Sequence, residues 1–219
     1  ATTNDPSIAE RIRQFQGKLD YPAHYWTWQQ LLHPPLMNWK ILPTYSVFGK
    51  YVLIISQWLH ILSKAVHWQE KRGLKPSYFP KRLPNALALL ALHQFKKLER
   101  FNRHRREIAE QYYKALQNTS FELPSRFEDR EHIFLRFTVK HPRAHEIIKK
   151  AWSRNLLIGD WYTSPVAPDD TRLDAVQYKK GSCPVAEKLS QETFNLPTHI
   201  HITEKEAQKI VEFLKNNGN

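Results

Sequence analysis

The sequence predicts an α+β fold, and three observations lead to this prediction. Residues 132–139 have the composition and partial alternation of a β-strand. Residues 142–154 follow with apolar residues at helical spacing. Thr203 and Glu206 then form the Thr-x-x-Glu pattern of a capping box, which begins a final helix. Short strands among separate helices are typical of a small α+β domain.

Composition narrows the class of protein. The chain has 219 residues, of which 41% are hydrophobic and 12% aromatic, enough to bury a core in one domain or two small ones. Its one cysteine, Cys183, excludes an internal disulfide framework. The chain starts at Ala1 with neither a methionine nor a secretory leader, so we expect a piece of a longer protein. The net charge of +12 favours polyanionic partners, unless an acidic remainder of the protein balances it.

The first element is a helix with a defined start and end. Asp5 can accept hydrogen bonds from the free backbone N–H groups, and Pro6 suits the first helical position. Apolar residues recur at helical spacing as far as Phe15, and Gly17 can end the helix.

Residues 21–50 are crowded with aromatic residues and prolines, so we expect them to be irregular or to form short helices. The run 51–63 is the most hydrophobic of the chain, but it is shorter than the roughly 20 residues that cross a bilayer. Its polar positions recur every three or four residues, which predicts a helix with one polar stripe and a broad apolar face. The stripe consists of Ser56, Gln57, His60, Ser63, Lys64 and His67.

Two interpretations of this helix remain open. It can be buried against the rest of the protein or a partner subunit. It can also lie in a membrane interface, where residues 51–72 would make a peripheral contact. Trp58 and Trp68 would then sit at headgroup level, with Lys71 and Arg72 among the basic residues that face anionic lipid.

Residues 84–117 carry one long helical pattern that can be broken or kinked. Several of its basic residues could neutralise nucleic-acid phosphates: Lys96, Lys97, Arg100, Arg103, Arg105 and Arg106. Only Phe101 could stack on a base, and opposite charges four residues apart, such as Glu99 and Arg103, suit a solvated helix face. We therefore expect no nucleic-acid partner.

The remaining elements complete the α+β unit. Residues 156–158 predict a short buried strand, residues 160–182 a loop, and Pro184 the start of another helix. The final helix has a buried stripe made of Ala207, Ile210, Val211 and Leu214.

Two motifs in the last third of the chain carry a family resemblance. Residues 183–187 read Cys-Pro-Val-Ala-Glu, and residues 196–203 read Leu-Pro-Thr-His-Ile-His-Ile-Thr. Together they resemble the closing segment of the DegT-type aminotransferases, pyridoxal-phosphate-dependent enzymes that act on nucleotide-linked sugars. Residues 2–13 resemble the run that follows the cofactor lysine in that family, and residues 81–95 and 102–112 resemble two of its helices.

The resemblance implies a fold, a domain division and a reaction. Residues 81–219 would form a long linking helix and the C-terminal small domain of an aspartate-aminotransferase-like fold. Residues 1–80 would be the tail of the large cofactor domain with a hydrophobic insertion. The catalytic lysine would precede residue 1, so this chain holds no catalytic residue. The intact enzyme would move an amino group, commonly from glutamate, to a nucleotide- or lipid-linked keto-sugar, as in the synthesis of cell-envelope polysaccharide.

The same resemblance implies binding residues and partners. Arg82 falls on an arginine that holds the phosphate of pyridoxal 5'-phosphate, a cofactor bound mainly by the missing half. Asp160, Trp161 and Tyr162 fall in a loop close to the bound sugar, where aromatic rings suit its apolar face and a carboxylate its hydroxyls. A homodimer is implied for the intact protein, which would be cytoplasmic or at the inner face of the membrane.

Other site types are not supported by the sequence. His199 and His201 could point together only on a strand, and no acidic cluster has metal-ligand spacing, so we expect structural roles and no metal. An alternative function is a non-catalytic binding domain that keeps the fold without the cofactor. Pro80, which has no N–H group and falls on a phosphate-binding asparagine, favours this alternative, as does Trp161 in place of a histidine.

Overall fold

The computed structural model describes residues 3–64, 66–76 and 78–218. The chain divides into two compact units between Phe95 and Lys96. The family resemblance implied a domain boundary after residue 80, ahead of helix α4 (Asn85–Phe95). Helix α4 packs against α2 (His24–Leu36) and therefore belongs to the first unit. The long pattern of residues 84–117 is broken at this boundary, because α5 begins at Leu98.

The first unit begins with helix α1 (Pro6–Gly17). The predicted start is confirmed, because Asp5 Oδ1 accepts hydrogen bonds from the backbone N–H groups of Ser7 (2.8 Å) and Ile8 (3.2 Å). The apolar residues of the helix, among them Phe15, are exposed within this chain.

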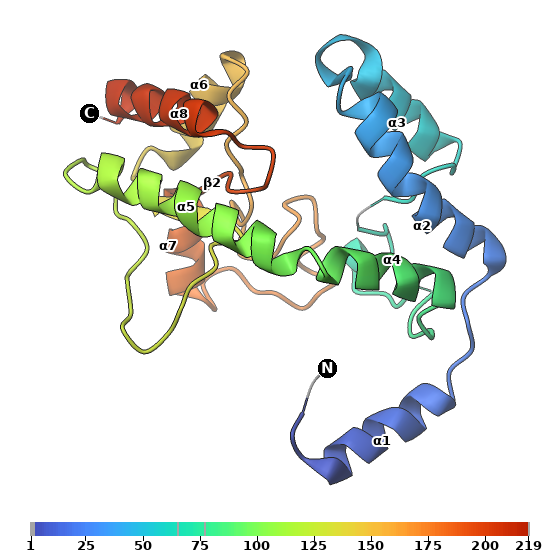
Figure 1. Cartoon of the computed structure of the whole chain (residues 1–219). Helices are drawn as coiled ribbons and strands as arrows, with labels where there is room; N and C mark the ends of the chain where they lie inside the picture. The colour runs from blue at the N-terminus through green and yellow to red at the C-terminus, as the bar shows by residue number, and fades with distance from the viewer. Residues whose placement is uncertain (1–2, 65, 77, 219) are drawn as a thin grey trace. The chain divides into compact units, whose positions relative to one another are not determined.

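Residues 24–58 form a helical hairpin, the blue and light-blue segment of Figure 1. Helix α2 continues into the π-helix η1 (Met37–Ile41), and the return leg comprises the π-helix η2 (Tyr45–Gly49) and α3 (Lys50–Trp58). The short helices expected here are confirmed. One short 3₁₀ turn, η3 (Glu70–Arg72), follows.

The predicted helix over 51–63 needs two corrections. It ends at Trp58, because Leu59 to Ser63 form turns and bends. Its polar stripe is also not one face of a helix: Ser56 is buried within α3, whereas His60 and Lys64 follow the helix and are exposed, and Trp58 is 75% exposed. The cause lies in α2, whose glutamine side chains provide hydrogen-bonding partners for the polar residues that follow α3.

A search of the described residues finds no helix that is both long enough and apolar enough to cross a bilayer.

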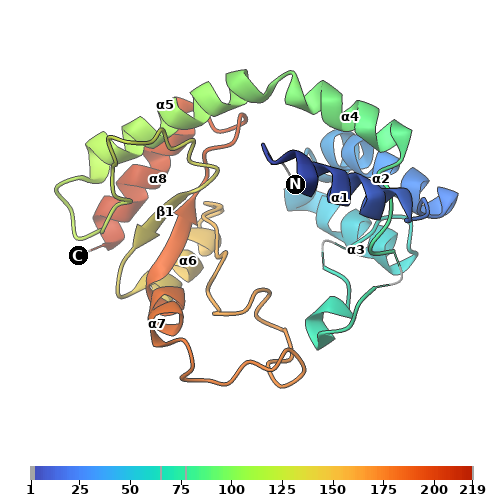
Figure 2. The same ribbon diagram turned by 90° about the horizontal axis from the view of Figure 1, so that it is seen from below.

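The second unit is built on a two-stranded antiparallel sheet, seen from below in Figure 2. Strand β1 (Phe137–Lys140) pairs with β2 (Thr193–Leu196), with Phe137 opposite Leu196. The predicted strand over 132–139 is thus shorter and shifted. No strand forms at 156–158; a single bridge joins Gly159 to Asn195. Strand β2 was missed, because four residues before a proline give too short a pattern to identify.

Four helices enclose this sheet. Helices α5 (Leu98–Leu116) and α8 (Glu204–Asn217) lie side by side (Figures 1 and 2), whereas α6 (Ala144–Ser153) packs against β2 and α7 (Pro184–Glu192). The fully buried side chains of the core come from helices and strands alike: Ile108, Tyr112, Leu116, Phe137, Val139, Ile147, Phe194, Leu196 and Leu214. The buried stripe and the capping box predicted for the final helix are confirmed.

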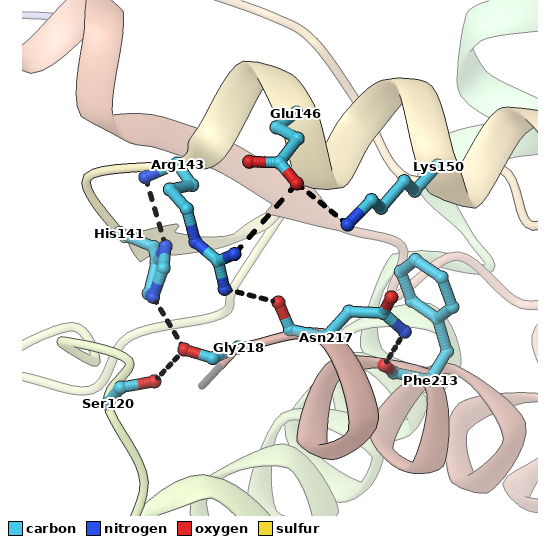
Figure 3. Close-up of polar contacts among 8 residues, drawn as sticks. All are labelled: Ser120, His141, Arg143, Glu146, Lys150, Phe213, Asn217 and Gly218. Carbon is cyan, nitrogen blue, oxygen red and sulfur yellow. Dashed lines mark hydrogen bonds and ion pairs between the residues drawn. The ribbon is translucent and has the colours of Figure 1, made fainter.

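The C-terminal end of α8 is fastened to the rest of the unit by three hydrogen bonds (Figure 3). Ser120 Oγ donates to the carbonyl of Gly218 (2.7 Å), and His141 Nε2 donates to the same oxygen (2.9 Å). Arg143 Nη2 donates to the carbonyl of Asn217 (2.8 Å). Helix ends leave carbonyls without partners, and here side chains from other elements supply the donors.

Candidate substrate-binding site

The loop that follows Ile158 is attached to the sheet through Asn195. The backbone N–H of Gly159 donates to the Asn195 carbonyl (2.7 Å), and Asn195 N–H donates back (2.9 Å). The Asn195 side chain donates to the carbonyl of Trp161 (3.0 Å) and accepts from the Thr138 hydroxyl (2.8 Å). A Cβ at position 159 would lie 3.2 Å from the Asn195 Cβ, so glycine permits this close approach. The loop therefore leaves the sheet in a fixed direction.

The predicted sugar-binding residues lie together on this loop. Asp160, Trp161 and Tyr162 are consecutive and exposed, with Trp161 at 49% and Tyr162 at 62%. The two rings are 6.2 Å apart at 67° to each other. Tyr162 has a φ of 70°, in the left-handed region that only a few per cent of non-glycine residues adopt. Strained backbone of this kind occurs often at ligand sites.

Arg136 is a residue of this site that sequence reasoning missed. Its guanidinium lies 4.1 Å from the centre of the Trp161 ring. Within the described part of the chain, no carboxylate lies within ion-pair distance of it. An arginine in the middle of the apolar run 132–139 was the available signal. This position places a cationic hydrogen-bond donor next to the three predicted residues.

The far end of the loop is held by the glutamate of the Cys-Pro-Val-Ala-Glu motif. Glu187 Oε1 accepts from the Tyr178 hydroxyl (2.7 Å) and from the backbone N–H of Gly181 (2.6 Å). The hydrogen bond to the carboxylate raises the pKa of Tyr178 to about 12. The same bond is the main cause that lowers the pKa of Glu187 from its usual value. This glutamate thus ties the loop to the first turn of α7.

Arg82, the predicted cofactor-binding residue, belongs to the first unit. Its Nε donates to the carbonyl of Gln16 (2.9 Å) and its Nη2 to that of Gly17 (2.7 Å), so the guanidinium caps the end of α1. The guanidinium also lies 5.6 Å from the centre of the Tyr21 ring. Only Nη1 is free of these hydrogen bonds. Phosphate binding by Arg82 stays a prediction and would depend on that one group.

Neither the histidines near the C-terminus nor the cavity beside α5 has the features of a binding site. The described residues contain no group of three or more histidine, cysteine or acidic side chains that could hold a metal ion. The His199 and His201 rings lie 6.0 Å apart, and burial is the main cause that lowers the pKa of His199. A cavity of about 260 Å³ lies beside α5, but its charges are already paired, Arg126 with Glu110 and Arg106 with Glu131, both at 2.8 Å.

Comparison with known proteins assigns the family. Residues 60–215 match the model of the DegT/DnrJ/EryC1/StrS aminotransferase family, which is well over half of the chain. The chain belongs to this family. A curated relative, the dTDP-3-amino-3,4,6-trideoxy-alpha-D-glucose transaminase of Micromonospora megalomicea subsp. nigra, is 27% identical over 139 residues, or 61% of this chain.

Solved structures of DegT-family aminotransferases confirm the fold. S. venezuelae DesV, solved in complex with a ketimine intermediate, is 21% identical with a TM-score of 0.54 and covers 66% of this chain. A DegT/DnrJ/EryC1/StrS aminotransferase from Brucella abortus is 18% identical with the same TM-score and the same coverage. The predicted α+β small domain of an aspartate-aminotransferase-like fold is therefore confirmed.

The chain spans only part of the length of these proteins. It covers 37% of the curated relative, 41% of the DesV chain and 40% of the Brucella chain. DegT-family enzymes in general depend on pyridoxal phosphate and act on sugars.

Proposed function

We propose that the complete protein is a pyridoxal-phosphate-dependent aminotransferase that transfers an amino group from glutamate to a keto-sugar linked to a nucleotide or a lipid. This chain would contribute one wall of the sugar site. The observation that carries the proposal is the exposed loop of Asp160, Trp161 and Tyr162, fixed to the sheet by Asn195 in a chain of the DegT family.

The chemistry of the loop suits a sugar bound through a phosphate. An aromatic ring can cover the apolar face of the sugar, and the Asp160 carboxylate can accept hydrogen bonds from its hydroxyl groups. Nucleotide- and lipid-linked sugars both carry phosphate next to the sugar. The Arg136 guanidinium has the planar set of donors that phosphate oxygens prefer, and Trp161 holds it in place from one side.

The cofactor would be held mainly by residues outside this chain. Pyridoxal phosphate, when bound, supplies the electron sink for amino transfer. Arg82 offers its phosphate one unengaged group, Nη1, and Pro80 offers no N–H. The catalytic lysine is likewise assigned to the part of the protein ahead of residue 1, so the isolated chain should not catalyse transamination.

The hydrogen bonds of Arg82 to the end of α1 also favour a second candidate function, a non-catalytic binding domain derived from the same fold. The two candidates differ in the sequence immediately upstream of Ala1. A Ser-x-x-x-x-Lys-type segment there supports the enzyme, and its absence supports the binding domain.

The test measures formation of 2-oxoglutarate from glutamate by the complete protein with a nucleotide-linked keto-sugar. We expect turnover, and we expect Arg136→Ala to raise KM for the sugar about tenfold, the equivalent of one hydrogen bond to a charged group. Trp161→Ala should raise KM by a similar factor, because it removes the aromatic contact with the sugar and with Arg136. Leu157→Ser is the matched control, because Leu157 is 73% exposed just ahead of the loop; its KM should not change. Turnover by the isolated chain would contradict the assignment of the lysine, and a complete protein that binds sugar without turnover would support the binding domain.

The proposal also covers the oligomeric state and the cellular location of the complete protein. The complete enzyme would be a homodimer in the cytoplasm. At the inner face of the membrane, peripheral contact through residues 51–72 would bring it close to a lipid-linked substrate.

A further inference from the structure

The hairpin of residues 24–58 has an inverted distribution of polarity. Two of its polar side chains, Gln29 and Ser56, are buried at 7% exposure each. Three of its apolar side chains are about three-quarters exposed: Trp39 at 78%, Trp58 at 75% and Val47 at 74%. A hairpin folded for contact with water would show the opposite arrangement.

The interior of the hairpin satisfies its own polar groups. The carbonyl of His60 accepts hydrogen bonds from the Gln29 amide and from the Tyr25 hydroxyl, the latter at 2.6 Å. The Gln30 amide donates to the Ser63 hydroxyl at 3.0 Å. Polar groups in contact with lipid must find their partners within the protein, and these groups do.

The outer surface is apolar along both legs and at the tip. Exposed large apolar side chains follow one another through the hairpin: Tyr25, Trp28, Trp39, Leu42, Tyr45, Val47, Phe48, Tyr51, Ile54, Ile55, Trp58 and Leu59. Single exposed apolar residues are normal on soluble proteins, whereas a dense set of them marks a surface that is covered in use.

The charge of the hairpin indicates which kind of partner covers its apolar surface. No aspartate or glutamate occurs between Asp20 and Glu70, and the charged residues of this stretch are Lys40, Lys50 and Lys64, all exposed. Lys40 follows Trp39 and Lys50 precedes Tyr51, so ammonium groups alternate with aromatic rings. Tryptophan, tyrosine and lysine in one surface are typical of the boundary between headgroups and acyl chains. An anionic bilayer complements this charge.

The hairpin lies outside the segment that matches the family model. That match begins at residue 60, and the hairpin comprises residues 24–58. Helix α3 is also too short to cross a bilayer, because its nine residues span about 14 Å at the α-helical rise.

We propose that the hairpin of α2, η1, η2 and α3 lies in the interface of an anionic lipid bilayer. The inference extends the peripheral contact proposed above from residues 51–72 to both legs of the hairpin, and it rests on that contact but not on transamination. Apolar side chains enter the acyl boundary while Lys40, Lys50 and Lys64 extend their ammonium groups to the headgroups.

The test is co-sedimentation of the whole chain with vesicles of phosphatidylcholine alone or mixed with phosphatidylserine. We expect binding to the mixed vesicles that weakens as salt is added. Trp39→Glu with Trp58→Glu should reduce this binding at least tenfold. Lys40→Gln and Lys50→Gln should each reduce it about fivefold on anionic vesicles and leave binding to neutral vesicles unchanged.

The control is the double variant Leu157→Glu with Val185→Glu, which changes similarly exposed apolar residues of the second unit. This variant should bind vesicles as the unmodified chain does. Circular dichroism confirms that each variant keeps its helices. Binding that survives the double tryptophan change overturns the proposal, as does absence of binding to every vesicle. A dimer that these changes dissociate, without any vesicle binding, also overturns it and assigns the surface to a second copy.

Two outcomes separate this inference from the earlier proposals. If Trp58→Glu alone abolishes binding and Trp39→Glu does not, the contact is confined to residues 51–72 and the hairpin inference fails. If the complete protein carrying both changes loses vesicle binding but keeps turnover of a soluble nucleotide-linked sugar, the membrane contact and the enzyme activity are independent.

Discussion

Glu187 illustrates at the scale of one residue how a family motif acts. Its carboxylate accepts hydrogen bonds from Tyr178 and from the backbone of Gly181, a left-handed glycine with a φ of 90°. The motif places a carboxylate in the first turn of α7, where the helix dipole also favours negative charge. The side chain therefore fixes where the loop after Ile158 ends.

The ionisation of Tyr178 reports on this contact. Its pKa of about 12 exceeds the ordinary value of 10, so its contribution to stability is complete below pH 10 and is lost as pH rises through about 12. Removing the carboxylate charge with Glu187→Gln should return the pKa of Tyr178 toward its ordinary value. The measurement is the absorbance of tyrosinate during alkaline titration.

Tyr178→Phe identifies the signal in this titration, because it removes the one phenol concerned among the nine tyrosines of the chain. Glu192→Gln is the control at the other end of α7 and should leave the titration unchanged. If Tyr178 titrates equally high in Glu187→Gln, the carboxylate is not the cause of the shift.

At the scale of elements, residues at a few junctions decide how the helices are positioned. Gly49 is one of them, because a Cβ there would lie 2.9 Å from the Thr44 hydroxyl and closer still to the Ile41 carbonyl. The hairpin tip thus requires glycine for the two π-helices to meet. The end of α8 depends instead on donors from Ser120, His141 and Arg143 (Figure 3).

His141 carries the most specific of the contacts to α8. Its Nε2 donates to Gly218 while its Nδ1 accepts from the backbone N–H of Arg143 (3.1 Å), which requires the neutral tautomer with hydrogen on Nε2. The ring also packs 4.9 Å from Phe121. Since His141 is buried, His141→Ala should lower the free energy of unfolding by about 1–3 kcal/mol.

Urea denaturation of the whole chain measures this loss, and hydrogen exchange near Asn217 locates it. Lys149→Ala, an exposed change on the same helix α6, serves as the control and should stay within about 0.5 kcal/mol. An unchanged midpoint for His141→Ala would show that the end of α8 is held by other contacts.

At the scale of the whole molecule, the two units differ in how much apolar surface they bury. In the described part of the first unit, the buried apolar side chains are Ile41 and Leu62, together with the prolines Pro22 and Pro76. The second unit has a continuous core drawn from α5, α6, α8 and both strands. Stability within a protein follows the density of such contacts.

The first unit should therefore open more readily than the second. By hydrogen exchange on the whole chain, we expect amides of α2 and α3 to exchange at least tenfold faster than those of α5 and α8, and urea to unfold the chain in two steps. Vesicles that bind the hairpin should slow exchange in α2 and α3 and leave α5 and α8 unchanged. One cooperative transition with uniform protection would contradict this division.

Features that depend on neighbouring residues could be predicted from the sequence. Asp5 marked the start of α1, Thr203 and Glu206 the capping box of α8, and the motifs at 183–187 and 196–203 the family, because caps and motifs act over a few positions. The loop with Asp160, Trp161 and Tyr162 was also identified, and it is exposed on the second unit.

Features that join distant segments of the chain could not be predicted, because they depend on how those segments pack. Strand β2 exists because β1 pairs with it, and Arg136 joins the candidate site because Asn195 brings Trp161 to it. Arg82 was matched to a cofactor phosphate, but the structure places it on the end of α1. The pattern of 51–63 predicted a broad apolar face without saying what covers it, and within this chain Ser56 is buried whereas Trp58 is exposed. A helical pattern fixes which residues share a face, whereas the direction of that face depends on the element packed against it.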